Sequence, residues 1–209
     1  FELAAYMGEA EQFAKLYQHR SDNPFDYELF CFQRWFVLRE FLEKNSLDCA
    51  FYIDSDVMLY SRISELKPWV EKVDVAVIQH GESCPSGGIS FVNNLSALTK
   101  LVGFFGEQYS SPELFKAVEV QYQRTRELGV YGGACDMTAI REFLATTDIA
   151  TGSIQSLLAE GDIDENMLSS DGYAMSQAGI KQVTWVNQLP YCTRLSDGEL
   201  VQMHALHFA

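Results

Sequence analysis

The chain has 209 residues, and its 15 lysines and arginines against 29 aspartates and glutamates give a formal charge of −14. This charge repels nucleic-acid phosphates and anionic lipids, and the 47% of hydrophobic residues excludes a disordered or fibrous chain. No apolar run approaches the roughly 20 residues of a membrane-spanning helix, so we expect a cytoplasmic protein without an integral membrane segment, with peripheral membrane association and oligomeric state left open.

Five segments have the apolar spacing or the end signals of helices. They span residues 2–19, 28–44, 95–109, 112–128 and a segment that begins near Asp136. The fourth has the clearest boundary, because Ser111 is a favourable cap and Pro112 suits the first helical position.

Short β-prone runs alternate with these helices. They span residues 50–54, 73–79, 88–92, 182–186 and 199–203. The first run is apolar on both faces, as in a buried parallel strand. Turn signals at 189–190 and 196–198 suggest that the last two runs form a terminal antiparallel pair. Without repeats or a linker, this alternation predicts a single α/β domain over residues 1–209.

The five cysteines form no C-x-x-C pair and are odd in number. This pattern argues against a disulfide framework and against a zinc site built from thiolates. We expect most of the cysteines to be buried, reduced thiols.

Asp54 and Asp56 follow the first strand and are separated by one residue. In an extended backbone both carboxylates point to the same side, and two such groups repel each other unless a cation lies between them. Open α/β sheets bind ligands at this edge, and carboxylate oxygens suit Mg²⁺ or Mn²⁺ holding a diphosphate. The alternatives are a solvated loop, or a phosphatase of the haloacid dehalogenase type with Asp54 as phosphoryl nucleophile. Met58 departs from that phosphatase motif.

The order of the motifs resembles that of nucleotide-sugar glycosyltransferases of the GT-A fold, especially bacterial polysaccharide and capsule-type enzymes. The matching segments are CFQRWFVLREFL, FYIDSDVML, VAVIQH, SGGISFV, YGGACDMTAIREF and the terminal LHF, within residues 28–209. The resemblance implies a mixed, mostly parallel sheet flanked by helices, with a C-terminal antiparallel pair and a first nucleotide-binding strand that would precede Phe1.

The implied activity is metal-dependent transfer of a sugar from a nucleotide-diphosphate sugar to a glycan or other hydroxyl acceptor. Polysaccharide or glycoconjugate synthesis is the implied setting, and a non-catalytic relative that binds nucleotide sugar or carbohydrate is the alternative. The resemblance assigns Asp54 and Asp56 to a Mn²⁺ or Mg²⁺ ion that bridges the donor phosphates. His207, in a segment similar to the family's H-F-x-G, would be a further metal ligand, and His204 is its competitor. The remaining possibility is that both histidines are ordinary surface residues.

The resemblance also implies further contacts with the donor and the acceptor. Arg34 would contact the donor or brace the aspartates. Arg39 is the alternative residue for this role, and the other possibility for Arg34 is a surface ion pair. Gly87 and Gly88 would let the donor approach the backbone, or would open a strand through a tight turn. Asp136 would be the general base or an acceptor contact, or simply a helix cap.

Two features of the C-terminal half remain open between structural and functional roles. Residues 161–172 are strongly acidic and read as a solvated loop, or as a lid near the donor. The lid would use Asp162, Asp164 and Asp171. Trp185 and Tyr191 would stack on a sugar or pack in the core.

Overall fold

The computed structural model describes residues 2–79 and 84–208. Its contacts divide the chain into two compact units, each made of two segments. The first comprises Phe1–Ala50 and Val92–Ile149, and the second comprises Phe51–Phe91 and Ala150–Ala209. A single domain over the whole chain stays a prediction. His80, the last residue of the VAVIQH segment, lies outside the described residues.

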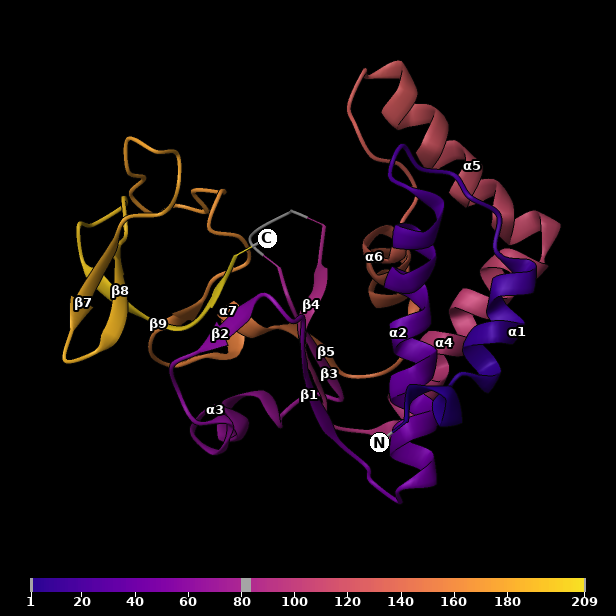
Figure 1. The fold of residues 1–209 in the computed structure, drawn as a ribbon, viewed down its shortest axis with the longest axis horizontal. Coiled ribbons are helices and arrows are strands. Elements are labelled where there is room, and N and C mark those ends of the chain that lie inside the picture. The colour runs from indigo at the N-terminus through magenta and orange to yellow at the C-terminus, as the bar shows by residue number, and fades with distance from the viewer. Residues whose placement is uncertain (1, 80–83, 209) are drawn as a thin grey trace. The chain divides into compact units, whose positions relative to one another are not determined.

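The first unit is built from helices (Figure 1). They are the 3₁₀ helix η1 (Leu3–Tyr6) and the α-helices α1 (Gly8–Leu16), α2 (Phe25–Lys44), α4 (Leu95–Ser110), α5 (Pro112–Glu127) and α6 (Asp136–Thr146). The expected helices are therefore confirmed, with the first one divided between η1 and α1. At the start of α5, the Ser111 hydroxyl accepts a hydrogen bond from a backbone amide, and Pro112 is the first helical residue, as predicted.

Aromatic side chains form the core of this unit. Phe13 of α1 stacks on Phe36 of α2 with ring centroids 4.8 Å apart, and Phe32 of α2 meets Phe105 of α4 edge-on at 5.2 Å. Both geometries are favourable for aromatic pairs and add to the free energy gained from burial. Helix α2 thus contacts α1 and α4 through its large apolar residues.

The second unit contains most of the strands. Its elements are β1 (Ala50–Ile53), β2 (Val57–Leu59), α3 (Ile63–Val70), β3 (Val75–Ile78), β4 (Ser86–Val92), β5 (Thr151–Ser153), α7 (Ile154–Leu157), β6 (Asp162–Ile163), β7 (Val183–Val186), β8 (Leu189–Thr193) and β9 (Leu200–His207). The strands expected at 50–54, 73–79 and 88–92 are confirmed as β1, β3 and β4. Elements β2, α3, β5, α7, β6 and β8 were not expected.

The strands form two sheets with the orders β1-β4-β3-β5 and β2-β9-β8-β7, and β6 also pairs with β9. Strand β3 runs parallel to β5, and β6 runs parallel to β9. The pairs β2–β9, β7–β8 and β8–β9 are antiparallel. The expected mostly parallel sheet is therefore wrong, because the C-terminal strands follow one another through tight connections that only antiparallel pairs allow.

The terminal antiparallel pair exists in a different form from the one predicted. Strands β7 and β9 each pair with β8, which begins at Leu189 and contains Pro190. The turn falls instead at Asn187 and Gln188, whose φ angles of 51° and 67° match the two left-handed central residues of a tight hairpin. Pro190 is tolerated because β8 pairs with β9 only from Tyr191 onward.

Apolar packing in the second unit fixes the ends of β1, β4 and β9. One core cluster combines buried side chains from α3, β3, β4 and β9, among them Leu66, Ile78, Ile89 and Ala205, and Ile53 of β1 packs against it. Because these strands are anchored on one core, the residues that follow β1 and end β9 keep a defined geometry.

Two expectations from composition can be compared with the structure. None of the helices within residues 2–79 and 84–208 has both the length and the apolar character needed to cross a bilayer. The cysteines are free thiols, as expected, but the prediction that most are buried is wrong. Cys192 is buried, whereas Cys49 is exposed.

Candidate metal centre

Asp54, Asp56 and His207 come together in the second unit. One potential ligand atom from each side chain lies within 4.8 Å of the other two. Asp54 follows β1, Asp56 precedes β2, and His207 ends β9. The antiparallel register of β2 and β9 pairs Val57 with His207, and the Phe208 amide donates to the Asp56 carbonyl at 3.0 Å. This pairing holds residues 56–57 beside residues 207–208.

A turn, and not an extended strand, brings the two aspartates together. Strand β1 ends at Ile53, and the Val57 amide donates to the Asp54 carbonyl at 3.3 Å, which closes a turn over Ser55 and Asp56. The backbone between the two carboxylates is therefore not extended, and the alternation of side chains along a strand does not set their direction. The turn occurs because β1 and β2 belong to different sheets, so the chain must change direction between them.

Gly88 of β4 provides the space in which Asp54 lies. The Asp54 amide donates to the Gly88 carbonyl at 2.8 Å, and the Tyr52 hydroxyl donates to Asp54 Oδ1 at 2.6 Å. A Cβ atom on Gly88 would lie 2.9 Å from Asp54 Oδ2 and 3.2 Å from His207 Cε1. Gly88 therefore allows a carboxylate and an imidazole to approach the backbone. Gly87 lies beside it as a buried residue of β4, and the donor approach expected at both glycines stays a prediction.

The His207 ring has a defined orientation. Its Nδ1 atom lies 2.5 Å from the Glu165 carbonyl oxygen, which can only accept, so Nδ1 must donate. In the neutral ring the lone pair then resides on Nε2, which lies 3.3 Å from Asp56 Oδ1. Two acceptor atoms at this distance repel each other unless a proton or a cation lies between them.

The donor set fits a small divalent cation. Two carboxylates and one imidazole offer the oxygen and nitrogen ligands that Mn²⁺ accepts, and Mg²⁺ shares the preference for oxygen. Metal-binding histidines usually donate their second ring N–H to a carbonyl or carboxylate, as His207 does to Glu165. These residues are therefore suited to the expected ion.

His204, the competing histidine, is engaged elsewhere. Its Nδ1 atom lies 2.7 Å from the Ser61 hydroxyl, and its Nε2 atom lies 2.9 Å from the Glu160 carbonyl oxygen. Both ring nitrogens thus already have hydrogen-bond partners. His204 and His207 are each 7% exposed, so the interpretation of both as surface histidines is wrong.

The acidic stretch at 161–172 is not a solvated loop throughout. Asp164 is 1% exposed and forms an ion pair with the buried Lys181, which also binds Asp171. Asp162 accepts a hydrogen bond from the Tyr173 hydroxyl at 2.6 Å. Asp164 tolerates burial because Lys181, ten residues beyond Asp171 in the sequence, pairs with both Asp164 and Asp171. Lys181 was not predicted as part of the site, because no motif in the sequence around it indicates a role.

Arg34 and Asp136 contact each other in the first unit. Arg34 Nη2 lies 2.6 Å from Asp136 Oδ2, and Trp35 Nε1 donates to the same oxygen at 3.3 Å. Asp136 is 2% exposed, and the N-cap of α6 is Cys135, so the interpretation of Asp136 as a simple cap is wrong. The expected roles of Arg34 toward the donor and of Asp136 toward the acceptor stay predictions.

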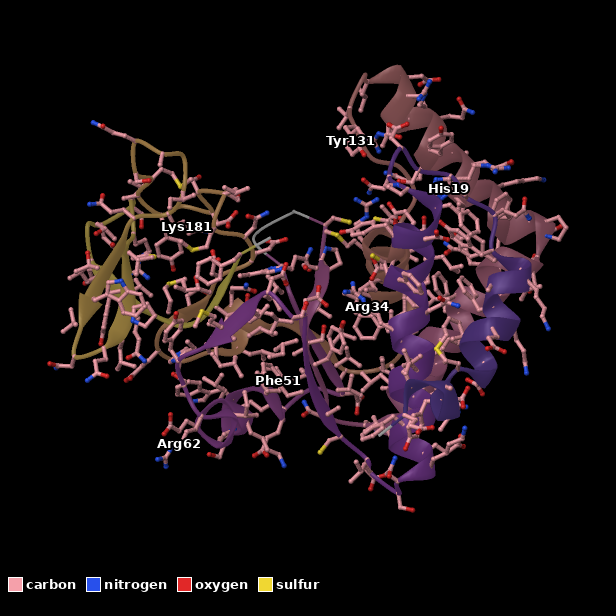
Figure 2. The ribbon with its side chains drawn as sticks, in the orientation of Figure 1. His19, Arg34, Phe51, Arg62, Tyr131 and Lys181 are labelled. Carbon is pink, nitrogen blue, oxygen red and sulfur yellow. The ribbon has the colours of Figure 1, made fainter. Side chains whose placement is uncertain are left out.

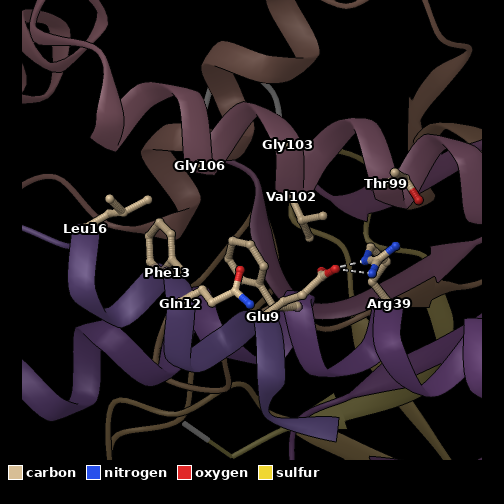
Figure 3. A pocket seen from close by; sticks show the side chains of 10 residues that line it. Glu9, Gln12, Phe13, Leu16, Arg39, Thr99, Val102, Gly103 and Gly106 are labelled. Atoms are coloured by element: carbon tan, nitrogen blue, oxygen red, sulfur yellow. Dashed lines mark hydrogen bonds and ion pairs between the residues drawn. The ribbon is translucent and has the colours of Figure 1, made fainter.

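Arg39, the alternative to Arg34, forms an ion pair with Glu9 of α1 (Figure 3). The pair lies at a pocket of about 330 Å³ between α1, α2 and α4, which also exposes Gly103 and Gly106 of α4. This engagement gives Arg39 a structural role within the helical unit.

Trp185 is 57% exposed, so core packing does not describe it. Its ring meets Tyr60 edge-on at 5.5 Å, and Tyr191 is half-buried on the neighbouring strand β8. Stacking of a sugar on Trp185 or Tyr191 stays a prediction.

Comparison of the chain with protein-family models, with curated proteins and with solved structures found no match in any of the three. The function of the chain must therefore be inferred from its own residues, and the cluster of Asp54, Asp56 and His207 is the most informative of them.

Proposed function

We propose that the chain is a metal-dependent glycosyltransferase that binds Mn²⁺ or Mg²⁺ through Asp54, Asp56 and His207. Its donor would be a nucleotide-diphosphate sugar, and its acceptor would be a hydroxyl group of a glycan or glycoconjugate. The observation that carries the proposal is the convergence of two carboxylates and an oriented imidazole within 4.8 Å.

The chemistry of sugar transfer explains why such a site is useful. When the glycosidic bond to the donor breaks, the departing diphosphate gains negative charge. A divalent cation held at the three side chains supplies positive charge to those oxygens. The chain itself carries a formal charge of −14, which would otherwise disfavour an anionic donor.

Each proposed ligand is held in place before any ion arrives. Tyr52 and the Gly88 backbone fix Asp54, the Glu165 carbonyl orients His207, and the contact of the Phe208 amide with the Asp56 carbonyl holds the backbone of Asp56. Ligands with restricted side-chain freedom lose less entropy on binding, so this support favours a specific site over a loose acidic patch.

The experiment is a donor-hydrolysis assay with UDP- and GDP-linked sugars, each with and without Mn²⁺. We expect metal-dependent release of the sugar by the wild-type chain and loss of that release in Asp56→Ala. Asp48→Asn, an exposed aspartate of the other unit, is the matched control and should retain activity.

The outcomes separate the proposal from its alternatives. Binding of a nucleotide sugar without hydrolysis or transfer would favour a non-catalytic relative. Formation of a covalent aspartyl phosphate on Asp54 would favour a phosphatase. Activity of the Asp56→Ala variant equal to that of the wild type would contradict the proposal outright.

A further inference from the structure

Lys181 is a buried charge with all of its hydrogen-bonding capacity in use. The residue is 2% exposed, and Figure 2 labels it among the loops of the second unit. Its Nζ atom lies 2.5 Å from Asp164 Oδ1, 2.6 Å from Asp171 Oδ2 and 2.9 Å from the Asn166 carbonyl oxygen. Three donors therefore meet three acceptors, which is the condition under which an ammonium group tolerates burial.

The loop of residues 164–167, which includes Asp164, contacts His207. The second oxygen of Asp164, Oδ2, accepts a hydrogen bond from the His207 amide at 3.0 Å. The next residue, Glu165, provides the carbonyl that binds His207 Nδ1, and the Met167 amide donates to the His207 carbonyl at 2.9 Å. The backbone from 164 to 167 thus contacts both the main chain and the ring of the proposed metal ligand.

Lys181 is connected to this loop through its backbone as well as its side chain. Its amide donates to the Met167 carbonyl at 2.8 Å. Asp164 is the link between the two groups, because one of its oxygens binds Lys181 and the other binds His207. Displacement of Asp164 would therefore move the Glu165 carbonyl and the Met167 amide, which both bind His207.

We propose that Lys181 is a positioning residue that fixes the 164–167 loop and thereby the tautomer and orientation of His207. The consequence for metal binding rests on the proposed function, but the effect on the histidine ring does not. Groups that orient a metal-binding histidine typically change metal affinity by about 10- to 100-fold when removed, and we expect a loss in this range.

The test uses two variants, because Lys181→Met leaves Asp164 buried without a counter-charge and can fail to fold. Asp171→Asn is the second variant. It removes the negative charge of one partner of Lys181 while Asp164 remains to balance the ammonium group, and asparagine tolerates the positive φ of 44° at this position. Val70→Ala, a truncation in the core of the same unit, controls for general loss of stability.

The first readout is the ¹⁵N spectrum of the histidine rings in the metal-free chain. We expect the neutral His207 ring of the wild type to be a single Nδ1–H tautomer. Lys181→Met and Asp171→Asn should each show a mixture of the two tautomers. The second readout is Mn²⁺ affinity, which should fall in the same variants. Val70→Ala should change neither readout, although its midpoint of unfolding should fall.

Three results would decide between a positioning role of Lys181 and its alternatives. A folded Asp171→Asn variant with the wild-type His207 spectrum and wild-type Mn²⁺ affinity would overturn the role of Lys181. If the wild type binds no Mn²⁺ but the tautomer changes appear, the positioning role stands and the proposed metal function fails. If Val70→Ala produces the same tautomer mixture, the effect reflects general loosening and the proposal is wrong.

Discussion

Replacement of Gly88 by alanine should weaken metal binding while leaving the fold intact. The added Cβ would lie 2.9 Å from Asp54 Oδ2, so this oxygen must retreat by about 0.5 Å to reach the ordinary contact distance of 3.4 Å. Metal–ligand distances in proteins vary by only about 0.2 Å, so the ligand cannot keep both its position and its van der Waals contact.

The expected loss is about 10- to 100-fold in Mn²⁺ affinity, or about 1.4 to 2.8 kcal/mol, by analogy with changes beside metal ligands. The backbone conformation of Gly88 lies outside the left-handed region, so alanine adds no strain there. Reduced freedom of the unfolded chain should offset part of the steric cost, and we expect a small change in the free energy of unfolding.

Electron paramagnetic resonance of free Mn²⁺ during a titration measures this affinity directly. Gly103→Ala is the matched control, because a Cβ at that position of α4 meets no atom within 4 Å. It should raise the free energy of unfolding by about 0.5 to 1 kcal/mol and leave the Mn²⁺ affinity unchanged. Equal Mn²⁺ affinities of Gly88→Ala and the wild type would show that Asp54 does not bind the ion in this position.

Three further predictions concern stability and reactivity. Gly133→Ala should lower the free energy of unfolding by about 1 to 3 kcal/mol or more in urea titrations, because its Cβ would lie 2.3 Å from the rigid carbonyl oxygen of Arg20; an unchanged midpoint would show that this contact is not tight. Burial raises the pKa of the Cys192 thiol to about 11, so a thiol reagent at pH 8 should modify exposed Cys49 first and Cys192 only after unfolding. Early labelling of Cys192, measured by mass spectrometry of peptides, would contradict the structure. Burial, together with Asp171 and Asp164, raises the pKa of Glu165 from 4.5 to about 7. Its contribution to the stability of the metal-free chain should therefore be present below pH 4.5 and decline as the pH rises through 7. Glu165→Gln should flatten this decline in thermal unfolding between these limits, and an unaltered slope would argue against the burial of the carboxyl group.

The helices and the inner strands could be predicted because their signals are local. The run of large apolar residues in α2, the apolar spacing of α4 and the Ser111-Pro112 boundary of α5 are visible in short windows of sequence. Strand β8 was missed because Leu189-Pro190 is a strong turn signal, whereas the actual turn uses Gln188 in a left-handed conformation that glutamine seldom adopts.

The candidate metal centre was predictable only in part. Asp54 and Asp56 stand out by their spacing, and His207 entered through a family resemblance, but spacing alone gives no reason to place β9 beside β2. That pairing depends on the whole second unit. Lys181 could not be identified from sequence, because its three partners come from residues 164–171 and become neighbours only after folding.

The most direct test of the account is Mn²⁺ binding by the wild type, His207→Gln and His204→Gln, measured side by side. The two histidines are equally buried and three residues apart, yet only His207 belongs to the cluster with the aspartates. We predict that the wild type and His204→Gln bind one Mn²⁺ ion with similar affinity and that His207→Gln binds it much more weakly. Equal binding by the two variants, or no binding by the wild type, would contradict the claim that these three side chains form a metal centre.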